Sequence, residues 1–214
     1  MFELIQPWSV PVIRTVLHPD IIKELIGVTD NLLNDPNTPS LGYSLAGQIE
    51  TELVVENDLL SRDCTNILLT FIQKFVTTAM NQKHGVSFTM FNMDFEKQIS
   101  PKIQITKIWM VSQQPNEYNP LHVHGNDSDI SGVLYLKVPE MIPPRKKHGA
   151  DGHINFSSNA SRDVKFSVPS TVFLPKGGDV YIFGPHQQHS VYPYRCKEGQ
   201  EDIERRSISF NAIC

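Results

Sequence analysis

The pattern of apolar residues changes at Gly85, and this change limits the folds open to the chain more than any other feature. Beyond Gly85 the sequence breaks into short segments rich in β-branched and aromatic residues, separated by Gly, Pro, Asn and Asp. We expect strands over residues 86–95, 103–111, 121–124, 132–138, 153–156, 164–168, 171–174, 179–183, 190–192 and 207–213. Many short strands bounded by turns indicate a sandwich or barrel, with residues 139–152 forming a long turn or insertion. The predicted fold is therefore mainly β.

Two helices are expected before Gly85. Residues 2–17 have an extended pattern, and Pro19 suits the first turn of a helix that runs to about residue 34. A second helix is predicted over about residues 58–82, with Gly85 as its stop, because apolar residues recur there on one face. That face consists of Leu68, Phe71, Ile72, Phe75, Val76 and Ala79. We expect one domain of residues 1–214, in which a helical region (1–85) packs on a β core (86–214).

Composition narrows the classes of partner. The net charge of −4 gives no general polyanion-binding signature, so no nucleic acid partner is expected. No run of about 18 apolar residues is present, so no membrane span is expected either. The three cysteines, Cys64, Cys196 and Cys214, are scattered without a CxxC pair, which favours reduced thiols and a cytoplasmic location.

Histidines provide a candidate metal site. His122 and His124 stand two residues apart, and on an extended strand residues i and i+2 point to the same face. Two imidazoles on one face can converge on a metal ion such as iron, zinc, copper or nickel. His189 is the candidate third ligand, although His186 in the same turn fits equally well on composition alone.

The last predicted strand has one polar face. Its alternation places Arg205, Ser207, Ser209 and Asn211 on one side and Arg206, Ile208 and Phe210 on the other. A polar face suits a strand that lines a wet cavity, where a buried Arg205 guanidinium would need an anion such as a carboxylate. Arg205 could instead be solvated or paired with Glu204 or Asp202, and the doubled arginine leaves the choice between Arg205 and Arg206 open.

Five ordered motifs together resemble one family. They are His122-Val-His124, SGVLYL at 131–136, GDVYIF at 178–183, HSVYP at 189–193 and RRSISFN at 205–211. This set resembles the 2OG-Fe(II) oxygenases of bacteria and marine phages, over roughly residues 100–214. The resemblance implies a double-stranded β-helix (a cupin-like jelly roll), Fe(II), 2-oxoglutarate as cosubstrate, and O2. It also implies hydroxylation of a small molecule, peptide or protein, with release of succinate and CO2.

The resemblance also assigns roles to residues. His122, His124 and His189 match metal ligands, Arg205 with Ser207 matches the pair that holds the far carboxylate of 2-oxoglutarate, and Tyr135 matches a tyrosine near the cosubstrate. Better-known relatives have Asp or Glu where this chain has His124, so Asp127 and Asp129 remain alternatives for that ligand. A phage-encoded protein would work in the host cytoplasm, and a homodimer is compatible with the sequence.

Two other functions remain open. One is a cupin-type iron dioxygenase with three histidines that does not use 2-oxoglutarate, and the other is a non-catalytic β-sandwich binding module. Arg205 separates the first of these from the oxygenase, because only the oxygenase needs a carboxylate anchor. Trp109, Lys137 and Tyr181 are candidates for lining the substrate mouth.

Overall fold

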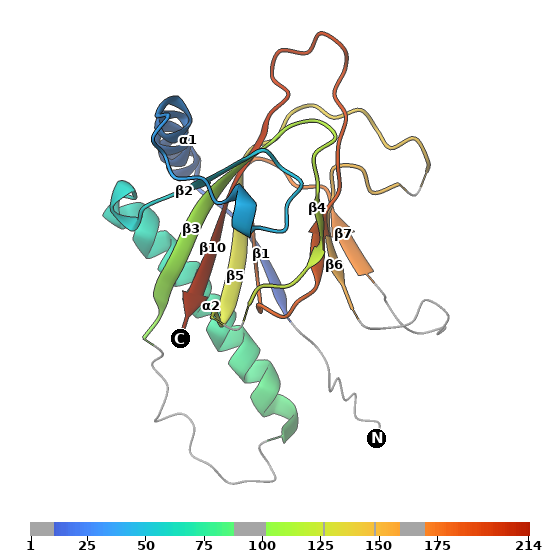
Figure 1. Cartoon of the computed structure of the whole chain (residues 1–214). Helices are drawn as coiled ribbons and strands as arrows, with labels where there is room; N and C mark the ends of the chain where they lie inside the picture. The colour runs from blue at the N-terminus through green and yellow to red at the C-terminus, as the bar shows by residue number, and fades with distance from the viewer. Residues whose placement is uncertain (1–10, 88–101, 126, 148, 159–169) are drawn as a thin grey trace.

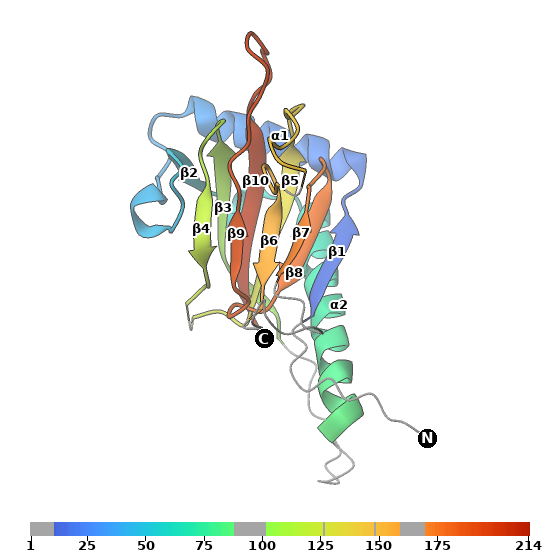
Figure 2. The same cartoon turned by 90° about the vertical axis from the view of Figure 1, so that its right-hand side faces the viewer.

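Two antiparallel β-sheets face each other, and two helices lie on the outer face of the larger sheet (Figure 1). The computed structural model describes residues 11–87, 102–125, 127–147, 149–158 and 170–214. The turned view shows the smaller sheet stacked in front of the larger one, with both helices behind (Figure 2). The arrangement is a jelly roll with helices on one side, as predicted.

The two sheets together contain ten strands among the described residues. In spatial order, the larger sheet consists of β1 (Val12–Val16), β8 (Asp179–Phe183), β5 (Ile130–Lys137), β10 (Arg205–Ile213), β3 (Gln104–Gln113) and β2 (Thr51–Val54). The smaller sheet consists of β4 (Asn119–His122), β9 (His189–Val191), β6 (Ile154–Ser157) and β7 (Ser170–Phe173). All the strand pairs are antiparallel.

The helices α1 (Pro19–Asn34) and α2 (Arg62–Ser87) bury their apolar faces on the larger sheet. The stripe predicted for the second helix is part of this core, with Leu68, Ile72, Phe75 and Val76 buried and Phe71 and Ala79 partly buried against them. Every second side chain of the central strands, such as Met110, Leu134 and Ile208, points toward the helices and completes this core. The side chains between them point into the space between the two sheets, where the candidate site lies.

Three expectations need correction. The second helix begins at Arg62, because a 3-10 turn over Asn57–Leu59 precedes it, and it continues past Gly85 to Ser87. A glycine inside a helix costs about 1 kcal/mol relative to alanine, which does not force the helix to end. Residues 86 and 87 are therefore helical, while the rest of the strand predicted over 86–95, and that over 164–168, fall outside the described residues.

The third correction concerns residues 1–85, which are not only helical. They contribute β1, within the predicted extended stretch, and β2, which was not predicted; these are the two edge strands of the larger sheet. β2 has four residues and pairs with β3 alone. That length is too short for a periodicity signal. The single domain over residues 1–214 stays a prediction.

Gly132 allows close packing at the centre of the larger sheet. It lies opposite Phe210 in the β5–β10 pair, and a Cβ atom at this position would meet Phe210 Cε1 at 2.5 Å and Tyr181 O at 3.1 Å. We expect Gly132→Ala to lower the free energy of unfolding by about 3 kcal/mol, because the core has no room to repack. Gly27→Ala in α1 is the matched control, since nothing lies within 4 Å of the added atom. Urea unfolding that gave equal midpoints for the two variants would contradict this packing.

Candidate active site

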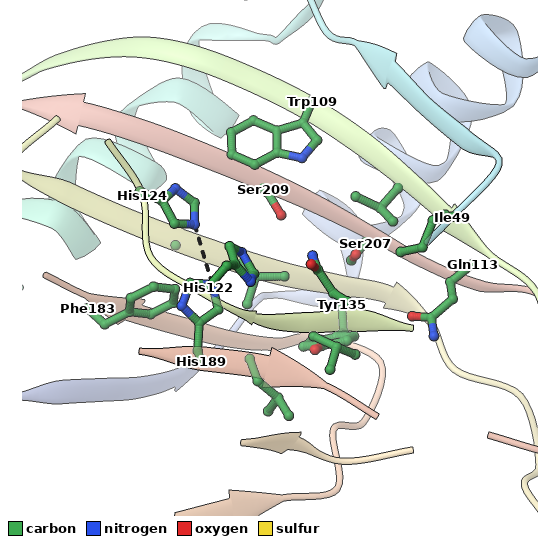
Figure 3. Close-up of a pocket in the computed structure, with 16 residues that line it drawn as sticks. Ile49, Trp109, Gln113, His122, His124, Tyr135, Phe183, His189, Ser207 and Ser209 are labelled. Carbon is green, nitrogen blue, oxygen red and sulfur yellow. Dashed lines mark hydrogen bonds between the residues drawn. The ribbon is translucent and has the colours of Figure 1, made fainter. Parts of the chain in front are cut away.

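Three histidines converge between the two sheets. One ring nitrogen from each of His122, His124 and His189 lies within 4.8 Å of the others (Figure 3). The register explains two of them, because His122 of β4 stands directly opposite His189 of β9. His124 follows two residues later, just after β4 ends, and its Nε2 lies 3.3 Å from Nε2 of His189. The i, i+2 spacing therefore brings both rings to one point even though the strand stops at His122.

Each imidazole is oriented through its Nδ1 atom. His122 Nδ1 lies 2.8 Å from Pro120 O, and His189 Nδ1 lies 2.9 Å from Gln187 O. His124 Nδ1 lies 2.8 Å from Asn211 Oδ1. These oxygens only accept, so each Nδ1 donates its proton, and the lone pair of each neutral ring is then on Nε2. Partners of this kind fix the tautomer and the orientation of metal-binding histidines.

Burial keeps all three rings neutral. Loss of solvent lowers the pKa of His189 to about 3 and that of His124 to about 4, and it also lowers the pKa of His122. A metal ion binds only the deprotonated imidazole. The cluster therefore presents three free lone pairs at pH 7.

The other candidate ligands are not part of this cluster. His186 is exposed, and Asp129 accepts a hydrogen bond from the Cys214 N–H at 2.9 Å. Asp127 is exposed as well. Among the described residues, the group with metal-binding geometry contains His124 and no carboxylate. The ligand roles of the three histidines stay predictions.

Arg205 is a buried cation without a counter-ion. Its side chain enters the space between the sheets and is 1% exposed. Nε and Nη2 donate to Gln113 Oε1 at 3.2 and 2.6 Å, and Nη1 donates to Gly152 O at 2.6 Å. No carboxylate of the described residues pairs with it, and burial lowers the pKa of its guanidinium. Burying an unpaired charge is unfavourable, so this position calls for an anion.

Arg206 points the other way and is fully paired. Its Nε and Nη2 atoms donate to the two carboxylate oxygens of Glu204 at 2.8 and 2.7 Å. Nη1 donates to Thr29 Oγ1 of α1 at 3.0 Å and also to Asp30. Glu204 therefore forms its ion pair with Arg206 and not with Arg205. Of the two adjacent arginines, only Arg205 faces the candidate site.

Two cavities meet at the histidines. The inner cavity, of about 50 Å³, is lined by Gln113, Tyr135, Ser207 and Ser209 among others, and Figure 3 shows Gln113 at the end away from His124. The outer cavity, of about 340 Å³, is lined by Ser44, Leu45, Ala46, Glu52, Lys107, Trp109, Asn119, His122, Val123, His124, Gly125, Asp127 and Asn211. Both cavities share Trp109, Asn119, His122 and His124. A molecule in either cavity would therefore touch the cluster.

Of the three residues expected at the substrate mouth, only Trp109 lines either of these two cavities. Lys137 is on the helix side, where its Nζ lies 3.4 Å from Asp30 Oδ1. Tyr181 is buried between the sheets against Phe173. Sequence position alone did not show which face Lys137 occupies, because the β5–β10 pairing shifts register next to it.

Sequence reasoning missed Glu52, a buried carboxyl on the wall of the outer cavity. It is 1% exposed, and its Oε2 has no hydrogen-bond partner within the described part of the chain. Burial raises its pKa to about 7; the negative charge of Glu117 also raises it, and Lys107 lowers it. The only signal in the sequence is an acidic residue between Thr51 and Leu53, which becomes meaningful once the β2–β3 register is known.

Glu52 should make stability depend on pH. Its pKa of about 7 in the folded protein lies above the ordinary value of 4.5, so the folded state holds a proton that the unfolded chain releases. The stability due to the neutral carboxyl is thus present below pH 4.5 and is lost as the pH rises through 7. We expect Glu52→Gln to unfold with about 2–3 kcal/mol more free energy than wild type at pH 8, and with equal free energy at pH 4.5. Urea unfolding at both pH values measures this, and equal stabilities at pH 8 would contradict it.

Comparison with known proteins identifies the class. Residues 107–211, which contain every candidate ligand and Arg205, match the family described as "Putative 2OG-Fe(II) oxygenase". A comparison with curated proteins finds no match. The class is thus that of the iron(II)- and 2-oxoglutarate-dependent oxygenases. The predicted enzyme class and its cofactors, Fe(II), 2-oxoglutarate and O2, are confirmed at the level of this family.

Solved structures that align with a TM-score above 0.5 confirm the fold. A Pseudomonas putida prolyl-4-hydroxylase aligns with 96% of this chain and 94% of its own at 12% identity and a TM-score of 0.54. The viral collagen prolyl hydroxylase of Paramecium Bursaria Chlorella virus-1, solved as a 2OG complex, covers 94% of both chains at 13% identity and a TM-score of 0.53. This chain spans 47% of an oxidoreductase of the 2OG-Fe(II) oxygenase family from Burkholderia pseudomallei, which covers 54% of this chain at 16% identity and a TM-score of 0.41. Within the described residues, no helix is long and apolar enough to cross a membrane.

Proposed function

We propose that this protein uses Fe(II) held by His122, His124 and His189, together with 2-oxoglutarate, to hydroxylate an organic substrate bound in the outer cavity. One observation carries the proposal. Three neutral histidines and a buried guanidinium without a counter-ion face the same space between the sheets. A metal ion and an anion are the two species that this pair of features requires.

The three histidines suit a catalytic rather than a closed structural metal site. Three protein ligands on one side of a metal ion leave positions open for a chelating cosubstrate and for O2. Because all three ligands are neutral, the metal keeps more positive charge than it would with a carboxylate ligand. That charge favours a dianionic cosubstrate electrostatically.

The inner cavity supplies the polar groups for a cosubstrate. Tyr135 and Ser207 line it, and burial raises the pKa of the Tyr135 hydroxyl to about 12, so that group stays a hydrogen-bond donor. Arg205 does not line the cavity itself, because Gln113 Oε1 occupies two of its donors. A carboxylate bound at Arg205 therefore takes the place of Gln113, which must turn away and enlarge the cavity.

When bound, iron and 2-oxoglutarate supply the oxidising chemistry, with succinate and CO2 as coproducts. The chain supplies geometry. Asn211 accepts from His124 and from the Ser131 hydroxyl at 2.9 Å, which holds the ligand ring in place at the boundary of the two cavities. The burial of Arg205 and Tyr135 keeps water from the anion site.

The same observation weighs against the two other functions. A three-histidine iron dioxygenase that does not use 2-oxoglutarate has no need of an unpaired buried arginine. A non-catalytic module needs neither the arginine nor the converging lone pairs.

We further propose a cytoplasmic location, supported by three cysteines that the structure leaves unpaired. We propose no nucleic acid partner, given the net charge of −4. The homodimer stays a prediction, which light scattering of the purified protein checks.

Measuring O2 consumption and succinate formation in one reaction separates the three functions. With Fe(II), 2-oxoglutarate and ascorbate as reductant in air, we expect slow turnover that consumes O2 and releases succinate in equal amounts. Zn(II) in place of Fe(II) should abolish both. O2 consumption without succinate would favour the dioxygenase that does not use 2-oxoglutarate, and the absence of both, with no metal bound, would leave the binding module.

A further inference from the structure

The outer cavity adjoins the candidate metal site and is lined by charged, polar and apolar side chains. Its volume of about 340 Å³ suits a small organic molecule or one side chain of a peptide. His122 and His124 form part of the wall, so a molecule bound there lies next to any metal that these histidines hold. On the proposed function, this cavity is where the substrate binds. The chemistry of its wall then indicates which substrates fit.

The register between β2 and β3 places Glu52 on the wall of this cavity. In the β2–β3 pair, Glu52 stands opposite Val111 and Leu53 stands opposite Met110. Residues directly opposite each other share a face of the sheet. Met110 belongs to the core beneath the helices, whereas Val111 lines the inner cavity. The carboxyl of Glu52 therefore lies on the inner face of the larger sheet, where the strand pattern would otherwise place an apolar side chain.

The surroundings of Glu52 lack a partner for it. Its neighbours include an apolar cluster of Ile49, Trp109 and Val111, with Leu41 and Leu45 packed against it. Gly47 passes so close that a Cβ atom there would lie 3.2 Å from Glu52 Oε1. Oε2 is buried and accepts no hydrogen bond from the described residues. An unsatisfied buried acceptor destabilises a fold, so such a group in a cavity wall points to a ligand that donates to it.

The charges around the cavity favour a cation as that ligand. Glu52 and Asp127 both line the cavity, and Glu117 is close enough to raise the pKa of Glu52. Lys107 is the basic residue among those that line the cavity; its ammonium lies 5.5 Å from the Trp109 ring centroid, and it forms no ion pair with Glu52. A neutral hydroxyl would satisfy the acceptor alone, whereas an ammonium also supplies the counter-charge.

We propose that Glu52 is the substrate-recognition residue of this oxygenase, and that the outer cavity takes a substrate with a protonated amine, whose ammonium donates to Glu52. This assignment rests on the proposed function and adds a substrate class to it. The carbon to be hydroxylated then lies within a few bonds of the amine, on the side facing the histidines. The loop before β2, which contributes Ser44, Leu45 and Ala46 to the wall, covers the amine end.

Calorimetry with matched ligand pairs tests the proposal. Wild-type protein loaded anaerobically with Fe(II) and 2-oxoglutarate is titrated with putrescine, L-lysine and glucosamine. Each is compared with its fully N-acetylated form, which has no ammonium: N,N′-diacetylputrescine, Nα,Nε-diacetyl-L-lysine and N-acetylglucosamine. We expect at least one amine to bind 10-fold or more tightly than its acetylated form. Glu52→Gln should remove that preference, and Glu50→Gln, which changes an exposed charge two residues away, should keep it.

The outcomes separate this proposal from the function on which it rests. Equal binding of amines and acetylated forms, no binding of any amine, or an unchanged preference in Glu52→Gln would each overturn the role of Glu52. Binding of 2-oxoglutarate is measured in the same samples and should be equal in wild type and both variants. If wild type failed to bind 2-oxoglutarate, this would contradict the proposed function itself, independently of the role of Glu52. Glu52→Gln is expected to be at least as stable as wild type, so misfolding does not explain a lost preference.

Discussion

Replacing His189 with alanine should abolish metal binding, whereas replacing His186 should leave it unchanged. His189 is buried and points its Nε2 at the other two rings, and His186 is an exposed residue of the turn that precedes it. With one of three ligands removed, we expect the affinity for Fe(II) or Zn(II) to fall by more than about 100-fold, beyond the 10–100-fold typical of lost supporting contacts.

The two variants form a matched pair for this measurement. Both lose one imidazole, at positions three residues apart in the sequence, so any general effect of the substitution appears in both. Competition with a chromophoric chelator gives the affinities, and thermal unfolding without metal shows that each variant is folded. Equal metal affinity in His189→Ala and wild type would remove His189 from the site, and loss of binding in His186→Ala would show that the wrong histidine had been assigned.

The second large effect concerns the two adjacent arginines: replacing Arg205 should impair binding of 2-oxoglutarate, and replacing Arg206 should impair stability. Arg205→Met should lower the affinity for 2-oxoglutarate by about 100-fold or more, because removing one partner of a buried charge pair costs roughly 2–5 kcal/mol of binding free energy. Without 2-oxoglutarate, the variant should be at least as stable as wild type, since methionine replaces a buried cation that has no counter-ion. Arg206→Met should do the opposite. It removes the bidentate partner of the mostly buried Glu204 and an ion pair to Asp30 of α1. We expect a loss of about 3 kcal/mol of unfolding free energy, with unchanged affinity for 2-oxoglutarate in the folded protein.

Calorimetry with metal-loaded protein and urea unfolding of metal-free protein measure the two halves of this pattern. A normal affinity for 2-oxoglutarate in Arg205→Met would contradict the anchor role of Arg205. A weakened affinity in Arg206→Met, after correction for unfolded protein, would show that the helix-side ion pairs and the site are not independent.

The jelly roll could be predicted because the strands after Gly85 alternate clearly and end at turn residues. Asp179–Phe183 was predicted to the residue, and the strands containing His122 and Arg205 were predicted within two residues at each end. β2 could not be predicted, because a four-residue edge strand carries little periodic signal and is defined by its pairing with β3.

The candidate site also has some parts that the sequence could predict and others that it could not. Parity along β10 was enough to place Arg205 and Ser207 on the face opposite Arg206, and the motifs favoured His189 over His186. The choice between His124 and the nearby aspartates was beyond the sequence, because it depends on how the chain turns at Gly125. Glu52 was also beyond it, because its burial follows from the register with Val111 and from the loop that contains Gly47. Neither of these long-range contacts leaves a local pattern.

Glu52 illustrates a trade between stability and recognition. At pH 8 the ionised carboxyl is expected to destabilise the fold, and glutamine should relieve this. The same substitution should remove the preference for amines. A residue whose replacement stabilises the protein and impairs ligand binding is typical of functional sites, where stability is sacrificed for a prepared binding group.

Anaerobic titration of the protein with Fe(II) and then with 2-oxoglutarate, followed by visible absorption, tests the central claim most directly. We predict a charge-transfer band that appears only when both are present. It should be lost in His189→Ala and Arg205→Met and retained in His186→Ala and Arg206→Met. Iron binding with no response to 2-oxoglutarate, or an undiminished band in Arg205→Met, would contradict the claim that three histidines and Arg205 form one site for iron and its cosubstrate.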